Sequence, residues 1–126
     1  MSEPKSDPNF IALYVESAQK SSAFYSALLG RTPVAASPAF VVFALDSGVR
    51  LGLWSRETVQ PAALAKAGAA EIGIPVSSSA AIDKTHAEWK ARGIAIAQEP
   101  TDMNFGRTFV GLDPDGHRLR VFAPAG

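Results

Sequence analysis

Apolar and polar residues alternate along several short stretches of this chain, which is the pattern of strands with one buried face. The alternation occurs at residues 10–15, 49–54, 71–76, 109–112 and 118–122, and the apolar stretches at residues 40–45 and 94–98 are also predicted to be strands. Two longer stretches instead repeat apolar residues at helical spacing. One predicted helix starts at Ser17 and ends before Gly30, and the other covers about residues 81–92 and ends before Gly93. Serine and glycine are preferred at helix starts and ends, respectively.

The same order of elements occurs twice along the chain. A short strand at residues 32–36 completes the first half, and residues 57–68 form an Ala-rich connector with a helical turn at 62–67. A loop is predicted at residues 100–104, before the final hairpin. An internal repeat of this kind indicates two copies of one supersecondary unit. The sequence therefore predicts an α+β fold of two tandem βαβββ modules, at about residues 10–56 and 69–124, in a single domain.

Charge and composition exclude several classes of function. Twelve acidic and twelve basic residues give no net charge, so we expect no attraction to nucleic acid or to anionic membranes. Cysteine is absent, which excludes disulfides and thiolate chemistry. The polar first eight residues contain no apolar signal segment, and no apolar run is long enough to cross a bilayer. We expect a soluble, cytoplasmic protein.

Several short motifs resemble those of a known family. They are Val15-Glu16-Ser17, Ser22-Ala23-Phe24-Tyr25, Leu29-Gly30 and the tight turn Asp113-Pro114-Asp115-Gly116-His117. In these the chain resembles the glyoxalase / bleomycin-resistance / extradiol-dioxygenase superfamily, also called vicinal oxygen chelate proteins. The resemblance implies a curved mixed sheet around a cleft, and homodimers whose clefts are often completed by the partner chain.

The resemblance also implies a test for metal chemistry. Enzymes of this family carry His, Gln or Glu at four positions, which correspond here to Phe10, Gly52, Glu71 and Arg120. Only Glu71 can ligate a divalent metal, and the permanent charge of Arg120 opposes a cation. We therefore expect no metal, no cofactor and no catalytic residue. His86, inside the second helix, and His117, in the final turn, are interpreted as ordinary surface or packing histidines.

The alternation along the strands indicates which side chains face the predicted cleft. They are Phe10, Ala12, Tyr14, Arg50, Gly52, Trp54, Glu71, Gly73, Pro75, Arg118, Arg120 and Phe122. The opposite strand faces are aliphatic, so they form the core against the helices. Apolar walls with sparse polar groups are typical of ligand-binding clefts.

Each candidate ligand-binding residue also has a purely structural interpretation. Trp54 is a stacking platform or a space-filling side chain, and Phe10 and Tyr14 are ligand contacts or cleft-floor packing. Arg120 recognises a ligand carboxylate or forms a salt bridge with Glu71. Residues 102–107, with Phe105 and Arg107, form either an adaptable lid over the cleft or an ordinary connecting loop. Trp89 is interpreted as helix-to-sheet packing.

The sequence thus favours a metal-independent binding protein of the bleomycin-resistance or phenazine-resistance type. It would sequester a planar aromatic antibiotic or metabolite by stacking on Trp54, and Arg120 or Arg107 would contact a carboxylate of the ligand. The alternative is an enzyme of the same family, a lyase, isomerase or dioxygenase relative that uses Glu71 as a general base or a residual metal. A regulatory module without catalysis is a third possibility.

Overall fold

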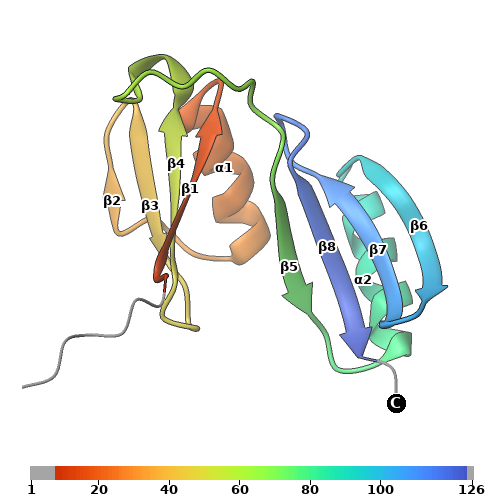
Figure 1. Cartoon of the computed structure of the whole chain (residues 1–126). Coiled ribbons are helices and arrows are strands. Elements are labelled where there is room, and N and C mark those ends of the chain that lie inside the picture. Colours follow the sequence, from red (N-terminus) through yellow and green to blue (C-terminus); the bar gives the residue numbers. More distant parts are fainter. Residues whose placement is uncertain (1–7, 125–126) are drawn as a thin grey trace, which may run out of the picture. The chain divides into compact units, whose positions relative to one another are not determined.

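The computed structural model describes residues 8–124, which form two compact units, one ending at Ala67 and the other beginning at Gly68. The first unit contains β1 (Phe10–Val15), α1 (Ala18–Leu29), β2 (Ala35–Ala36), β3 (Phe40–Ala44), β4 (Arg50–Ser55) and the short 3-10 helix η1 (Arg56–Thr58). The second contains β5 (Glu71–Pro75), α2 (Ser79–Ala91), β6 (Ile96–Met103), β7 (Gly106–Leu112) and β8 (Arg118–Pro124). The prediction of two βαβββ modules is confirmed (Figure 1).

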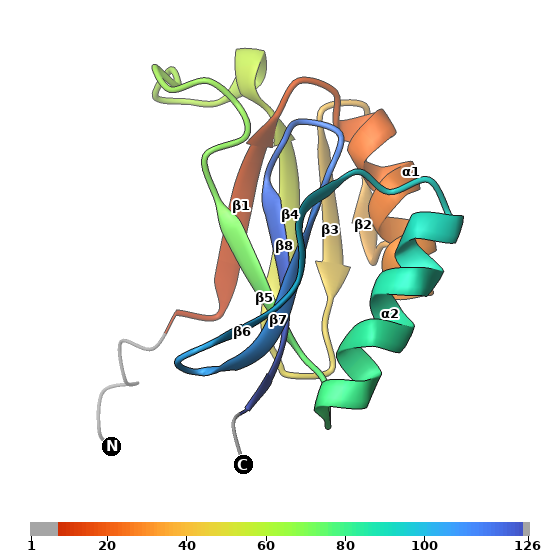
Figure 2. The ribbon, with the colours of Figure 1, turned by 90° about the vertical axis from the view of Figure 1, so that its right-hand side faces the viewer.

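Each unit is a four-stranded mixed sheet with the same topology. The strand orders are β1-β4-β3-β2 and β5-β8-β7-β6. In both units the first strand pairs in parallel with the last, and the other pairs are antiparallel. Each helix lies along one face of its own sheet (Figure 2). The first and last strands can pair in parallel because the chain between them, a helix and two strands, is long enough to form a crossover.

The helices begin and end where their capping residues predict. The Ser17 hydroxyl accepts the backbone N–H of Lys20, and the Ser78 hydroxyl accepts that of Ala81. Gly30 adopts the left-handed conformation, with φ of 63°, that ends α1. The second helix begins two residues earlier than predicted because Ser78 is the residue that caps it.

The core of each unit lies between the helix and its sheet. The buried residues of the first unit include Leu13, Val15, Tyr25, Val41, Phe43, Leu51 and Leu53, and those of the second include Ile82, Trp89, Phe109, Leu119 and Val121. Trp89 packs edge-on against Phe109, with ring centroids 5.1 Å apart, so its predicted role between helix and sheet is confirmed. The aliphatic strand faces predicted from the sequence therefore do face the helices, most clearly at Leu13, Val15, Leu51, Leu53, Leu119 and Val121.

Three local predictions are wrong. Strand β2 begins at Ala35 rather than at residue 32, because Pro33 has no N–H to donate to a strand ladder. The helical turn predicted at residues 62–67 is absent, and η1 forms at Arg56–Thr58 instead. The predicted loop at residues 100–104 is largely strand, because Pro100 lies on the edge strand β6 at a register irregularity between Gln98 and Thr101.

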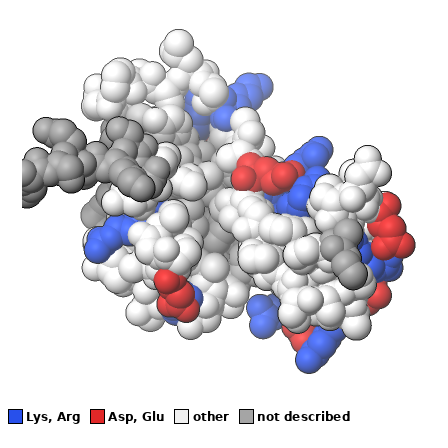
Figure 3. Space-filling view, turned by 60° about the horizontal axis from the view of Figure 1, so that its bottom comes forward, with Lys and Arg blue, Asp and Glu red and all other residues white. Residues whose placement is uncertain are grey.

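Surface properties agree with the neutral composition. On the face shown in Figure 3, acidic and basic side chains are scattered in small groups and most of the surface is uncharged. Within residues 8–124, no helix has the length and apolar character needed to cross a membrane.

Candidate functional site

Four aromatic side chains lie together on the face of the first sheet that is opposite α1. They are Phe10 and Tyr14 on β1, Phe40 on β3 and Trp54 on β4, and we call them the aromatic face. Phe10 stacks on Phe40 with centroids 6.3 Å apart, and Phe40 meets Trp54 edge-on at 5.4 Å. Tyr14 meets the other side of Trp54, also edge-on, at 6.2 Å. The four rings thus form one continuous row across three neighbouring strands.

The aromatic face is open rather than packed. Phe10 is 42% exposed and Tyr14 is 39% exposed, and Trp54 is half-buried. By contrast, Leu13, Val15 and Leu53, which point to the helix side of the same strands, are fully buried. Large exposed rings gathered on one face mark an interaction surface more often than they mark a fold requirement. This arrangement can stack a flat apolar molecule.

Gly52 makes room for the rings at the centre of the aromatic face. A Cβ atom added to Gly52 would lie 2.9 Å from the ring of Phe10 and 3.3 Å from the ring of Phe40. Gly52 pairs with Ala12 on β1 and with Val42 on β3, neither of which carries a ring. A glycine here therefore lets the two rings pack close to the sheet.

The second sheet carries a polar cluster centred on Arg120 of β8. Its Nε donates to Glu71 Oε2 at 3.1 Å, and its Nη1 donates to Gln98 Oε1 at 3.1 Å and to Thr108 Oγ1 at 3.4 Å. The Phe105 ring lies over the guanidinium, 6.0 Å from Cζ to the ring centroid. We call these five residues the Arg120 cluster. The Glu71–Arg120 salt bridge, one of the two roles predicted for Arg120, is thus present.

Beside the Arg120 cluster the surface of the second sheet is hollowed. The hollow has a volume of about 210 Å³ and is lined by Ala97, Gln98, Val110, Arg118 and Arg120. Val110 pairs with Arg120 in the register of β7 and β8, so both side chains point to the same side of the sheet. The hollow is below the 300–1,000 Å³ typical of small-molecule pockets, so it accommodates part of a ligand rather than a whole one.

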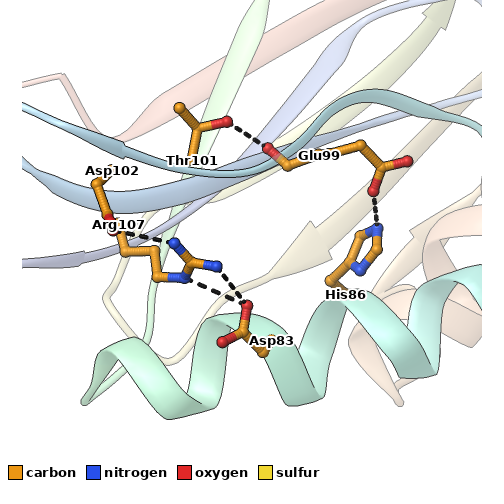
Figure 4. A network of polar contacts seen from close by, with 6 residues as sticks. All are labelled: Asp83, His86, Glu99, Thr101, Asp102 and Arg107. Carbon is orange, nitrogen blue, oxygen red and sulfur yellow. Dashed lines mark hydrogen bonds and ion pairs between the residues drawn. The ribbon is translucent and has the colours of Figure 1, made fainter.

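Arg107 does not join these residues. It pairs with Ala123 on β8, so its side chain is on the α2 side of the sheet, where it binds Asp83 at 3.0 Å and Asp102 at 3.0 Å (Figure 4). These hydrogen bonds, that with Asp83 above all, raise the pKa of Arg107 above its ordinary value. The loop predicted at residues 102–107 is mostly strand, and only Asn104 and Phe105 form the turn. The structure therefore places Phe105, but not Arg107, on the side of Arg120.

His117 anchors the final turn. Its Nδ1 lies 2.8 Å from Asp113 Oδ2, and its Nε2 accepts the backbone N–H of Gly68 at 3.1 Å. Asp113 Oδ1 also accepts the backbone N–H groups of Asp115 and His117. Asp113, Asp115 and His117 are close enough to hold a metal ion, but both ring nitrogens of His117 already have partners. The Asp-Pro-Asp-Gly-His motif therefore has a structural role here.

The other histidine connects α2 to β6. His86 Nε2 lies 2.6 Å from Glu99 Oε2 (Figure 4). Its ring packs edge-on against the buried Phe109, with centroids 5.3 Å apart. His86 therefore lies on the helix side of the sheet, away from the Arg120 cluster, and packs as the sequence predicts.

The residues at the four family positions do not fit a divalent metal. Phe10 and Gly52, in the first unit, supply no oxygen or nitrogen ligand, and the ring of Phe10 occupies the space beside Gly52. In the second unit, Arg120 holds the one carboxylate, that of Glu71. A hard cation needs several oxygen or nitrogen ligands, and a guanidinium beside the only carboxylate opposes its binding.

Three residues of the candidate site were missed from the sequence. Phe40 lies in a strand that was predicted, but the side chains of that strand were not included among those that face the cleft. In the structure Phe40 pairs with Trp54 and lies on the same side of the sheet. Gln98 and Thr108 require the pairing of β6 with β7 and of β7 with β8, which no local pattern gives.

Comparison with known proteins identifies related sequences and structures. A family model described as the Glyoxalase/Bleomycin resistance protein/Dioxygenase superfamily matches residues 8–121. The phenazine antibiotic resistance protein EhpR of Enterobacter agglomerans is 33% identical over 121 residues, which cover 94% of this chain and 92% of EhpR.

Solved structures include proteins with the same fold as this chain. A protein of Agrobacterium tumefaciens, known from a solution NMR structure, is 49% identical with a TM-score of 0.87, over 97% of this chain and all of the other. A glyoxalase/bleomycin resistance protein/dioxygenase from Nocardioides is 25% identical with a TM-score of 0.81, over 98% of this chain and 86% of that one.

Proposed function

Because this chain belongs to the glyoxalase/bleomycin resistance protein/dioxygenase superfamily, we propose that it is a metal-independent binding protein that sequesters a planar aromatic antibiotic or metabolite. The observation that carries the proposal is the aromatic face. It includes two of the four family metal positions, where Phe10 and Gly52 stand in place of residues that bind a metal. A surface of this kind binds flat molecules and offers no group that reacts with them.

The geometry of the aromatic face supports stacking as the mode of binding. Trp54 is held edge-on by Tyr14 on one side and by Phe40 on the other. Its indole is therefore fixed in orientation before any ligand arrives, so little side-chain entropy is lost on binding. Stacking is driven by apolar area and by the ring quadrupole, and it accepts many planar compounds.

The related resistance protein supports the class of ligand. EhpR is named for resistance to phenazine antibiotics, and phenazines are planar tricyclic compounds. Sequestration needs no turnover, so the protein would protect a cell by binding the compound in stoichiometric amounts. We include in the proposal that the protein acts as a cytoplasmic homodimer, in which a second copy of the chain contributes to each binding site.

The alternative enzymatic function has less support. It requires Glu71 as a general base or as the ligand of a residual metal, and in either role the carboxylate must be available. Glu71 instead accepts a hydrogen bond from Arg120 and is held in an ion pair with it, so the carboxylate is already engaged.

Intrinsic fluorescence provides the test. Phenazines and other planar antibiotics are titrated into the wild-type protein, into Trp54→Ala, and into Trp89→Phe, in which Trp54 is the one remaining tryptophan. We expect quenching in the wild type and in Trp89→Phe. Trp54→Ala should bind about tenfold more weakly by calorimetry, a loss of about 1.4 kcal/mol.

The same preparation tests metal independence and assembly. We expect affinity and melting temperature to be unchanged after dialysis against EDTA, and sedimentation to give the mass of a dimer. Absence of quenching by every compound, or a stoichiometric metal that survives dialysis and is needed for binding, would overturn the proposal.

A further inference from the structure

The guanidinium of Arg120 is only partly occupied by its neighbours. Its Nε and Nη1 donate to Glu71, Gln98 and Thr108, whereas its Nη2 has no hydrogen-bond partner within residues 8–124. The side chain of Arg120 is 20% exposed. The pair of N–H groups on Nη2 is therefore available to a molecule that approaches the hollow beside it.

Glu71 offers the complementary group at the same place. Its Oε2 accepts from Arg120, and its Oε1 has no partner in the part of the chain that the structure describes. The Glu71 side chain is 43% exposed, and it belongs to the same ion pair. An open donor and an open acceptor thus belong to one ion pair, and the net charge of the pair is zero.

A donor and an acceptor in this arrangement favour one type of ligand group. A primary carboxamide presents a carbonyl oxygen and an NH₂ group in one plane, so it can accept from Arg120 and donate to Glu71 at the same time. A carboxylate presents acceptors alone, so it gains the attraction of Arg120 but meets the like charge of Glu71. Glu71 already provides the charge that an anionic ligand would otherwise supply to Arg120.

The surroundings of the pair are consistent with a flat substituent. The Phe105 ring covers the guanidinium, and the hollow of about 210 Å³ is smaller than a complete aromatic antibiotic requires. Arg118 also lines the hollow, but it is exposed, and solvent and salt screen its charge more than that of the half-buried Arg120.

We propose that Glu71 determines the specificity of the Arg120 cluster, and that the cluster selects an uncharged donor–acceptor group such as a primary carboxamide over a carboxylate. The inference rests on the proposed function, because it takes a planar aromatic compound with a polar substituent as the ligand. It replaces the expectation that Arg120 contacts a ligand carboxylate.

A pair of matched ligands tests the inference. Phenazine-1-carboxamide and phenazine-1-carboxylate share one ring system and differ in the charge of the substituent at pH 7. Calorimetry with the wild-type protein is expected to give at least fivefold tighter binding of the carboxamide. In Glu71→Gln the like charge is removed and the shape is kept. The ratio of carboxamide affinity to carboxylate affinity should therefore fall at least tenfold, so that the carboxylate binds more tightly.

Two further variants separate a local effect from a change in net charge. Glu88→Gln changes the net charge by the same amount but lies exposed on α2, which packs on the other face of this sheet. It should keep the wild-type preference. Arg120→Gln should weaken the binding of both compounds, because it removes the donor that both of them use.

The outcomes distinguish this inference from the proposed function. Equal affinities in the wild type, a wild-type preference for the carboxylate, or the same ratio in wild type and Glu71→Gln would overturn the inference while stacking on Trp54 stands. If neither compound binds and no planar compound quenches Trp54, both proposals fail together.

Discussion

Two glycines under aromatic rings provide a sharp prediction, because the same substitution should have different effects at the two positions. A Cβ atom added to Gly111 on β7 would lie 2.7 Å from Cε3 and Cζ3 of Trp89 and 3.3 Å from Cγ2 of Ile94. A Cβ atom added to Gly52 on β4 would lie 2.9 Å from the ring of Phe10. Both distances are shorter than van der Waals contact, so in each case the ring must move.

The stability lost in each variant depends on how freely the neighbouring aromatic ring can move. Trp89 is 6% exposed and is packed against Phe109, so it cannot move without disturbing the core of the second unit. Overpacking of this kind typically costs 1–3 kcal/mol, and the better strand propensity of Ala recovers about 0.5–1 kcal/mol. Because Trp89 is held on all sides, the cost should lie in the upper part of its range, about 2–3 kcal/mol. We therefore expect Gly111→Ala to lower the free energy of unfolding by about 1–2 kcal/mol, or the melting temperature by roughly 4–8 °C.

Gly52→Ala should act on binding instead of stability. Phe10 is 42% exposed, so its ring can rotate into solvent, and we expect the free energy of unfolding to change by less than about 0.5 kcal/mol. The rotation removes one ring from the aromatic face. An aromatic contact is worth about 0.5–1.5 kcal/mol, so the affinity for a planar ligand should fall about two- to tenfold.

Thermal and urea denaturation followed by circular dichroism measure the stability of both variants, and calorimetry measures the affinity. The double variant Gly111→Ala/Trp89→Phe adds a control, because the smaller ring leaves room for the methyl group and the two effects should not add. The reasoning is refuted if Gly111→Ala is as stable as the wild type, or if Gly52→Ala is destabilised as much as Gly111→Ala.

Two further predictions concern the final turn and Arg107. His117→Ala should destabilise the protein by about 2–4 kcal/mol, because it removes the buried ring that contacts Asp113 Oδ2 and accepts the Gly68 N–H. The exposed Pro114→Ala in the same turn should cost less than half as much by urea denaturation, and equal costs would contradict this role of His117. Arg107→Ala should change the affinity for planar ligands less than twofold in calorimetry, since Arg107 binds Asp83 on the helix side. A tenfold loss would place Arg107 in the binding site after all.

The fold could be predicted from the sequence because its signals are local. Ser17 and Gly30 mark the ends of the first helix, and alternation along each strand separates the helix side from the open side. The same alternation correctly placed Phe10 and Trp54 on one face. These patterns depend on the period of a strand or a helix, which does not change with tertiary context.

The polar contacts could not be predicted, because they depend on the register between strands. Arg107 was assigned to a loop, and once β7 begins at Gly106 its side chain necessarily points to α2. Pro100 suggested a break in the chain, but an edge strand tolerates proline. Likewise, the motif around His117 indicated a turn, and its hydrogen bond to Gly68, 49 positions away, has no signal in the sequence.

The hydrogen bond between Gly68 and His117 also marks a practical division of the chain. Gly68 begins the second unit, and Leu64, four residues earlier, is 95% exposed. A break among exposed connector residues leaves the strand pairings of both sheets intact. The protein is therefore suited to protein ligation in the connector, so that one repeat carries ¹⁵N and the other does not. NMR spectra of such samples would report which repeat a ligand contacts.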